Sequence, residues 1–115
     1  MLFNSFIKAV SGIAGPGTSL KEATKSAPNS MGCYKIYYHG LKYVGKAEDG
    51  IRKRFVQYYN GTTAHYPSAR KIYEYRDEIT VTWQVCRSRE ETRALEAIWI
   101  AQYDPDWNER SGWRS

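Results

Sequence analysis

The sequence predicts a small α/β (α+β) domain in which a three-stranded antiparallel sheet is flanked by helices. The chain has 115 residues, 42% of them hydrophobic, which is enough for one core but hardly for two. Two segments rich in aromatic and β-branched residues flank His39-Gly40, a pattern typical of a β-hairpin. A third segment, residues 79–85, alternates strictly between apolar and polar residues and predicts another strand.

The first 27 residues are expected to form an N-terminal helical arm. Ser19 and Glu22 have the spacing of a capping box, and Pro28 ends the helix that they predict. The arm contains no evident catalytic residue, so we expect it to cover one face of the core or to bind a partner. Before it, apolar residues at helical spacing predict a short amphipathic helix over residues 2–10: Leu2, Phe3, Phe6, Ile7 and Val10.

The hairpin brings two tyrosines to one face of the sheet. If His39 and Gly40 form a two-residue turn, Tyr34 lies opposite Gly45, whose missing side chain leaves room for the phenol. Tyr34 then meets Tyr43 diagonally, at about 7–8 Å. By strand alternation, the residues expected on this face are Tyr34, Ile36, Tyr38, Leu41, Tyr43 and Gly45.

A helix is expected after the hairpin, with Glu48 or Asp49 as its N-cap. Arg54 and Tyr58 are four residues apart on it, so they project together. Its predicted inner side consists of Ile51, Phe55, Tyr58 and Tyr59.

Two further helices and the third strand complete the prediction. Pro67 suits the first turn of a helix that ends near Arg76, and Ser88 with Glu91 forms a capping box for a last helix that ends near Tyr103. We expect the following residues to face the core: Ala69, Ile72 and Tyr73 of the first helix, Ile79, Val81, Trp83 and Val85 of the strand, and Leu95, Ile98, Trp99 and Gln102 or Tyr103 of the last helix.

Charge and cysteine content limit the class of protein. A net charge of +5 and a pI near 9.2 favour polyanionic partners without requiring one. Cys33 and Cys86 lack the spacing of a zinc site and are expected to be partly buried thiols in a reducing compartment. No apolar run approaches the roughly 18 residues of a membrane span, and the N-terminus lacks the pattern of a signal peptide. We therefore expect a soluble, cytoplasmic protein that does not bind membranes.

Five chemically distinctive residues occur in a characteristic order: Tyr34, Tyr43 in Tyr43-Val44-Gly45, Arg54, Glu96, and Asn108 after Pro105. Over residues 28–109 this order and the elements that carry it resemble the GIY-YIG nuclease family. The similarity is greatest to the nuclease domain of the bacterial excision-repair incision subunit and to intron-encoded homing endonucleases. Residues 110–115 are then a short C-terminal tail. Two departures are Cys33, in place of an aliphatic residue, and Tyr58, where several members have His.

The resemblance implies divalent-metal-dependent hydrolysis of a phosphodiester bond in DNA, by in-line attack of water. It implies that Tyr34 is the general base, helped by Tyr43 or Lys46. Because an unperturbed phenol has a pKa of about 10, some nearby positive charge is needed for this role. From its charge, Lys46 is either a second phosphate contact or a cation that helps a phenol to ionise.

The resemblance also implies that Arg54 contacts the scissile phosphate, with support from Tyr58, and that Glu96 holds one Mg²⁺ or Mn²⁺. A lone carboxylate suffices for such a cation when water and substrate phosphate complete its shell. His65 is a candidate substrate contact, a proton relay or an ordinary loop histidine. Asn108 is expected beside the substrate site, as a brace whose amide satisfies the backbone.

Two other functions remain open at this stage. One is a noncatalytic nucleic-acid-binding or accessory domain with the same fold, and the other is a nuclease that acts as a toxin. The sequence does not distinguish double-stranded DNA from single-stranded or branched DNA or from RNA. Since no second module follows the predicted nuclease core, sequence specificity is expected to need a protein partner.

Overall fold

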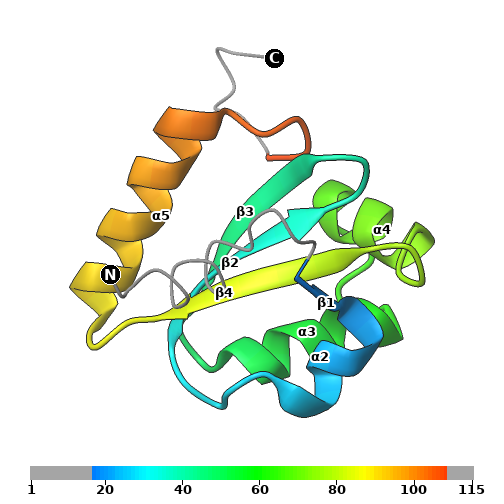
Figure 1. The fold of residues 1–115 in the computed structure, drawn as a ribbon, viewed down its shortest axis with the longest axis horizontal. Helices are drawn as coiled ribbons and strands as arrows, with labels where there is room; N and C mark the ends of the chain where they lie inside the picture. Colours follow the sequence, from blue (N-terminus) through cyan, green and yellow to red (C-terminus); the bar gives the residue numbers. More distant parts are fainter. Residues whose placement is uncertain (1–16, 109–115) are drawn as a thin grey trace.

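The computed structural model describes residues 17–108, which form a four-stranded antiparallel sheet and four helices (Figure 1). The strand order is β1-β4-β2-β3, so β3 is an edge strand. Along the chain the elements are β1 (Thr18–Ser19), α2 (Leu20–Ser26), β2 (Gly32–Tyr37), β3 (Leu41–Ala47), α3 (Ile51–Asn60), α4 (Pro67–Glu74), β4 (Thr80–Val85) and α5 (Arg89–Tyr103).

The prediction of three strands is wrong by one. The additional strand, β1, pairs Thr18 with Val81 and Ser19 with Thr80 of β4. Two residues are too few to show alternation in a sequence, so only the neighbouring strand reveals that they are extended. The predicted helix over residues 2–10 and the tail at 110–115 lie outside the described residues.

The hairpin register agrees with the prediction except at the turn. Tyr37, not Tyr38, pairs with Leu41, because the register shifts after Ile36. The connection therefore has three residues, with positive φ at His39 and Gly40. The expected pairs away from the turn are confirmed: Tyr34 with Gly45 and Ile36 with Tyr43.

Successive residues of β2 face different helices. The Tyr34 ring packs edge-on against Phe55 of α3, with ring centroids 5.4 Å apart. Its neighbour Cys33 points the other way, and its Sγ donates to the carbonyl of Thr92 on α5. The sheet thus separates α2 and α3 from α5, as Figure 1 shows. The main core lies on the α2 and α3 side and includes Leu20, Ala23, Tyr34, Ile36, Ile51, Phe55, Ile72 and Val81.

Three predicted helix starts are confirmed. Ser19 accepts a hydrogen bond from the Glu22 amide, and Ser88 accepts one from the Glu91 amide. Pro67 occupies the first turn of α4. In each case the signal is local, since a hydroxyl bonds an amide three residues along the chain, or a proline ring presets φ.

The predicted cap of α3 is wrong. Its N-cap is Gly50, which has a φ of 130° and makes no side-chain capping bond. The first amides of α3 donate instead to the carbonyls of Pro28 and Ser30. Glu48 bonds Arg93 of α5. Capping of this helix depends on contacts between distant segments.

The predicted apolar stripe of α5 is only partly buried, since Leu95 and Trp99 are half-buried. Thr92 is the buried residue of this helix, whereas Ile98 is 58% exposed and Tyr103 is 41% exposed. Val85 of β4, also expected inside, is 49% exposed. α5 packs mainly against β3 and β2, so within residues 17–108 it covers only part of its side of the sheet.

Both cysteines are buried and unpaired, as expected. Burial, reinforced by neighbouring Cys86, raises the pKa of the Cys33 thiol to about 12. A protonated thiol is a weak nucleophile, so Cys33 acts as a small core residue. Within the described part of the chain, no helix has the length and apolar character of a membrane span.

Candidate active site

Two tyrosines of different elements form a buried pair at the edge of the core. The Tyr34 hydroxyl lies 2.5 Å from the Tyr58 hydroxyl, which α3 brings over β2. Tyr34 has no exposed surface and Tyr58 is 4% exposed. The Tyr43 ring lies 6.3 Å from that of Tyr34, close to the diagonal spacing predicted from the hairpin. The three phenols therefore form one cluster.

Burial governs the acidity of the paired phenols. It raises the pKa of Tyr34, and neighbouring Tyr43 adds to this effect, whereas the Arg54 charge lowers it. Burial likewise raises the pKa of Tyr58, with a further contribution from Tyr34. In the free protein both phenols are therefore protonated at neutral pH, and Arg54 is the described charge that most favours a Tyr34 phenolate.

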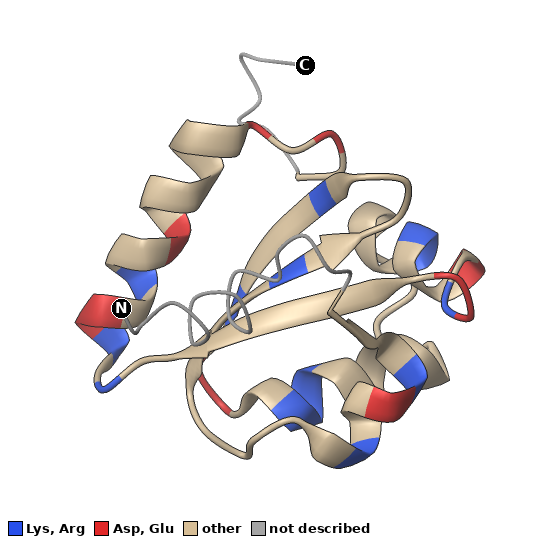
Figure 2. Ribbon diagram, in the orientation of Figure 1, with Lys and Arg blue, Asp and Glu red and all other residues tan. Residues whose placement is uncertain are grey.

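Arg54 connects α3 to the edge strand. Its Nη1 donates to the Lys46 carbonyl of β3 at 3.2 Å, and its Nε donates to Oε1 of Gln57 at 3.2 Å. These two bonds hold a half-buried guanidinium beside the phenols. Figure 2 shows Lys and Arg along α3, next to acidic residues in the loop that precedes it.

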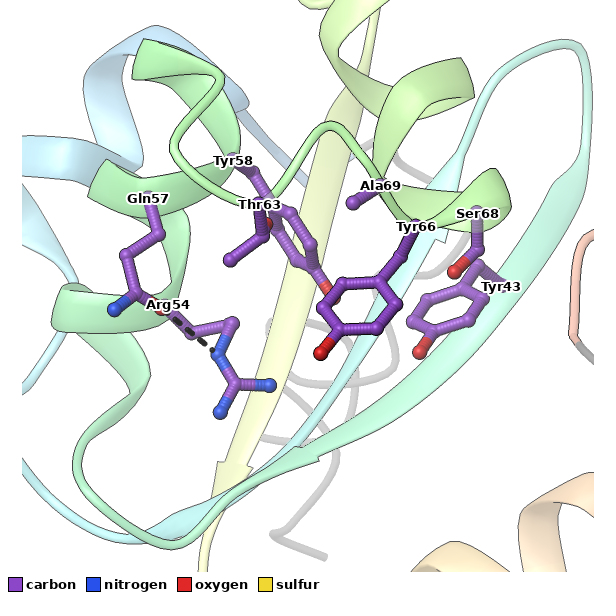
Figure 3. Close-up of a pocket in the computed structure, with 8 residues that line it drawn as sticks. All are labelled: Tyr43, Arg54, Gln57, Tyr58, Thr63, Tyr66, Ser68 and Ala69. Atoms are coloured by element: carbon purple, nitrogen blue, oxygen red, sulfur yellow. Dashed lines mark hydrogen bonds between the residues drawn. The ribbon is translucent and has the colours of Figure 1, made fainter.

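Arg54 also separates two surface hollows. The first, which we call the tyrosine pocket, has a volume of about 320 Å³; Figure 3 shows Tyr43 and Tyr66 at one side and Arg54 with Gln57 at the other. Its lining is completed by Tyr58, Thr63, Ser68 and Ala69. The second, the charged pocket, has a volume of about 430 Å³ and is lined by Lys46, Glu48, Asp49, Arg54 and Arg93.

Glu96 approaches the site from the other side of β3. It is half-buried on α5, and this burial raises the pKa of its carboxyl, while the charges of Lys46 and Arg54 lower it. The carboxylate therefore interacts with the two cations that flank the charged pocket. It lines neither pocket itself. The edge of β3 is the place where groups from both faces of the sheet approach one another.

The C-terminal segment covers the other half of this edge. Asn108 accepts from the Val44 amide at 2.9 Å and donates to the Val44 carbonyl at 2.8 Å, and the Trp107 amide donates to Lys42. Asn108 thus makes the backbone bonds expected of a brace. Its amide occupies the β3 edge next to Tyr43 and leaves the Lys46 end to Arg54.

His65 lies near the tyrosine pocket but outside its lining, whereas several residues without a predicted role line it. His65 is exposed, packs on Tyr66 with ring centroids 4.2 Å apart, and lines neither pocket. Sequence reasoning assigned no role to Gln57, Thr63 or Tyr66. Gln57 lies one helical turn after Arg54, which is the one local signal that points to it.

The donor set fits a hard divalent cation held weakly. Among the described residues, no three His, Cys, Asp or Glu side chains are grouped as a metal cluster. Mg²⁺ is commonly bound by one or two carboxylates together with water and substrate phosphate. Glu96, half-buried beside cations that attract phosphate, can provide the protein's share of such a site.

Comparison with known proteins identifies the family of this chain. Residues 30–110 match the family model described as the GIY-YIG catalytic domain. The chain is 34% identical over 83 residues to UvrABC system protein C of Streptomyces avermitilis. This aligned stretch covers 70% of this chain and 12% of the relative. The chain is 33% identical over 95 residues to the same protein of Rhodococcus erythropolis, covering 81% and 13%. The chain therefore spans only about an eighth of these relatives.

A solved structure agrees with the fold. The magnesium-bound GIY-YIG N-terminal endonuclease domain of UvrC from Thermotoga maritima superposes with a TM-score of 0.64 and 28% identity. The match covers 78% of this chain and 96% of that domain. Since the family model spans most of the chain and the fold agrees, the chain belongs to the GIY-YIG family and carries its catalytic domain.

Proposed function

We propose that the protein is an endonuclease that hydrolyses phosphodiester bonds in DNA and depends on Mg²⁺ or Mn²⁺. The observation that carries this proposal is the Tyr34 and Tyr58 hydroxyl pair beside Arg54, with the Glu96 carboxylate within electrostatic reach of the same arginine. The Thermotoga domain, described as an endonuclease bound to its catalytic divalent cation, supports it.

Arg54 and Lys46 are proposed to receive the scissile phosphate. The guanidinium of Arg54 is already oriented by Gln57 and by the β3 backbone, so little reorganisation is needed when charge develops on the phosphate. A planar guanidinium also matches two phosphate oxygens at once. Lys46 follows Gly45 on the same edge and adds a second positive charge.

Tyr34 is proposed as the general base, acting together with Tyr58 and Tyr43. Tyr34 has no exposed surface, so a proton from the attacking water reaches it through a phenol that lines the tyrosine pocket. Its hydrogen-bond partner Tyr58 and its neighbour Tyr43 both line that pocket. Arg54 stabilises the phenolate form, because its charge lowers the Tyr34 pKa against the effect of burial.

Glu96 is proposed to hold the divalent cation, which when bound offsets negative charge on the leaving oxygen. The carboxyl must be ionised to do so. Burial raises the pKa of this carboxyl, and the charges of Lys46 and Arg54 oppose that effect and favour the ionised form. A site with one protein carboxylate implies weak metal binding until substrate phosphate joins it.

A cleavage assay tests the proposal. Its substrates are plasmid DNA, single-stranded DNA, branched DNA and RNA, each incubated with Mg²⁺, with Mn²⁺ and with chelator. We expect DNA to be cleaved only when the cation is present, and we expect the cleavage rate to fall by at least about 10²-fold in Glu96→Gln. Glu90→Gln is the matched control, since Glu90 is an exposed glutamate in the first turn of the same helix. Folded protein that leaves every substrate intact with both cations would disprove the proposal.

A further inference from the structure

The tyrosine pocket extends beyond the groups that the reaction requires. Tyr43, Arg54 and Tyr58 form only part of its wall. The remainder comes from the loop after α3 and the start of α4, which contribute Thr63 and Tyr66 among others. Neither of these two residues touches the phenol pair or the Glu96 carboxylate through a described hydrogen bond, so the proposed hydrolysis leaves them without a role.

Thr63 contributes an unsatisfied polar atom to this wall. Its Oγ1 is buried and has no hydrogen-bond partner among the described residues. Buried hydroxyls nearly always have partners, because leaving one unpaired is costly. Thr63 lines the pocket, so rotation of its side chain about χ1 would turn this hydroxyl toward a polar ligand there, which would supply the missing partner.

Tyr66 contributes an exposed aromatic ring. It is the N-cap residue of α4 and is 58% exposed, and His65 packs against it at 4.2 Å. Its backbone is held by a bond from its amide to the Thr63 carbonyl. An exposed ring on a fixed backbone, supported from one side, is a suitable surface for stacking a flat ligand.

We propose that the tyrosine pocket binds the unpaired nucleobase next to the scissile phosphate, stacked on Tyr66 and hydrogen-bonded to Thr63. Arg54 lines the same pocket, so a phosphate at its guanidinium places the adjoining nucleoside at this wall. The volume of about 320 Å³ lies at the lower end of ligand pockets and suits a single base. This inference rests on the proposed action on nucleic acid.

The class of substrate follows from this subsite. A base inside a duplex is paired and stacked, and must be extruded before it enters a pocket, whereas a base in a single strand or at a junction is already accessible. Single-stranded and branched DNA are therefore the preferred substrates. Because stacking accepts every base, little sequence preference is expected from Tyr66.

Binding measurements in chelator separate the base from the phosphates. A single-stranded oligothymidylate is compared with an abasic oligomer of the same length, which has the same backbone charge. We expect the wild type to prefer the oligothymidylate by about tenfold and Tyr66→Ala to lose most of that preference while binding the abasic oligomer unchanged. Tyr66→Phe should keep it, and Tyr103→Ala, which removes a 41% exposed tyrosine elsewhere, should match the wild type.

A Tyr66→Ala effect that is equal on both oligomers, or absent from both, would overturn the inference, as would a wild type that binds neither oligomer at low salt. Cleavage with Mg²⁺ is scored separately. If the protein cleaves DNA but Tyr66→Ala keeps the preference for the oligothymidylate, the subsite alone is refuted. If Tyr66→Ala loses that preference but the protein never cleaves, the hydrolytic function alone is refuted.

Thr63→Val provides a second test, whose expected result differs from that of a purely structural role for Thr63. Valine has nearly the shape of threonine without its hydroxyl, so replacing an unpaired buried hydroxyl should leave the melting temperature of the free protein unchanged or raised. Binding of the oligothymidylate should nevertheless weaken severalfold. Thr62→Val, at the preceding exposed position, should lower neither the oligothymidylate affinity nor the melting temperature. Unaltered binding by Thr63→Val removes Thr63 from the subsite.

Discussion

The phenol of Tyr34 lies directly over the backbone of Gly45, its partner across β2 and β3. A Cβ at Gly45 would overlap the hydroxyl oxygen and ring carbons of that phenol. The glycine therefore determines where the Tyr34 hydroxyl meets Tyr58. This contact joins the two tripeptides that give the family its name, because the Tyr34 ring fits only where residue 45 has no side chain.

Gly45→Ala tests this contact. The added methyl group must displace a fully buried ring, so we expect a loss of about 1–3 kcal/mol in the free energy of unfolding, measured by urea denaturation. Cleavage should fall as well, because the hydroxyl pair is disturbed. In a Tyr34→Ala background the same change should cost much less, and an equal loss in both backgrounds would show that the contact is not the cause.

Removing either hydroxyl of the buried pair should destabilise the protein. Tyr34→Phe leaves the Tyr58 hydroxyl buried without its partner, at a cost of about 1–3 kcal/mol, and Tyr58→Phe does the converse. The double variant should be more stable than the sum of the two losses predicts. Additive losses in urea denaturation would contradict a direct bond.

The same variants differ in activity if Tyr34 is the base. Tyr34→Phe should reduce the cleavage rate by about 10²–10⁴-fold, the usual contribution of a general base. Tyr58→Phe should retain more activity, because Tyr43 also connects Tyr34 to the pocket. Single-turnover rates at saturating protein make this comparison, and a Tyr34→Phe rate near that of the wild type would exclude Tyr34.

Cleavage should increase with pH. Burial raises the pKa of Tyr34, so the phenolate is the minor form below that pKa and its fraction grows about tenfold per pH unit. We expect log kcat to rise with a slope of about one from neutral to moderately alkaline pH. Circular dichroism at each pH confirms that the protein stays folded, and a rate that does not vary with pH would contradict proton transfer to a buried phenol.

The link between Glu48 and α5 should stabilise the protein in a pH-dependent way. A hydrogen bond from Arg93 lowers the pKa of the Glu48 carboxyl, although burial opposes this. Because the pKa is lower in the folded state, the stabilisation is present above the unfolded value of 4.5 and is lost as the pH falls through the folded value.

Melting temperatures of Glu48→Gln and wild type measure this effect. The difference between them should be larger near neutral pH than in strong acid, where both side chains are uncharged, and should shrink in high salt. Glu22→Gln is a suitable control, since Glu22 is exposed and makes no described ion pair. An undiminished difference in acid would assign the effect to packing.

Asn108 should contribute to the stability of the edge strand. Asn108→Ala removes both bonds to Val44 and leaves a buried amide and carbonyl of β3 unpaired. We expect a loss of about 2–4 kcal/mol in urea denaturation, together with faster amide exchange at Val44. Asn60→Ala, at the exposed end of α3, should have little effect. Unchanged exchange at Val44 would rule out the brace.

Local chemistry was sufficient to predict much of this fold. The starts of α2 and α5 follow from Ser19 and Ser88, because each cap bonds an amide three residues away. The pairing of Tyr34 with Gly45 follows from hairpin geometry and strand alternation. These helix starts and this strand pairing could be predicted because each signal lies within a few residues of the chain.

Contacts between distant segments decided the rest. β1 is extended because β4 lies beside it, and Gly50 caps α3 because Glu48 bonds Arg93 while the carbonyls of residues 28–30 receive the helix amides. Ile98 stands at a position that its periodicity predicts to be buried, yet α5 covers too little of the sheet to bury it. No local pattern encodes these outcomes.

By itself, then, the sequence determined which chemical groups the protein brings to the edge of its sheet: phenols on one hairpin face, an arginine one turn from a third phenol, and a distant glutamate. Tertiary structure alone decided that Glu96 approaches β3 from the face opposite Tyr34, that both phenols of the pair are buried, and that Thr63 and Tyr66 form the wall of the neighbouring pocket. The physical reason is that side-chain periodicity specifies a face of an element, whereas burial and pKa depend on what the rest of the chain packs against that face.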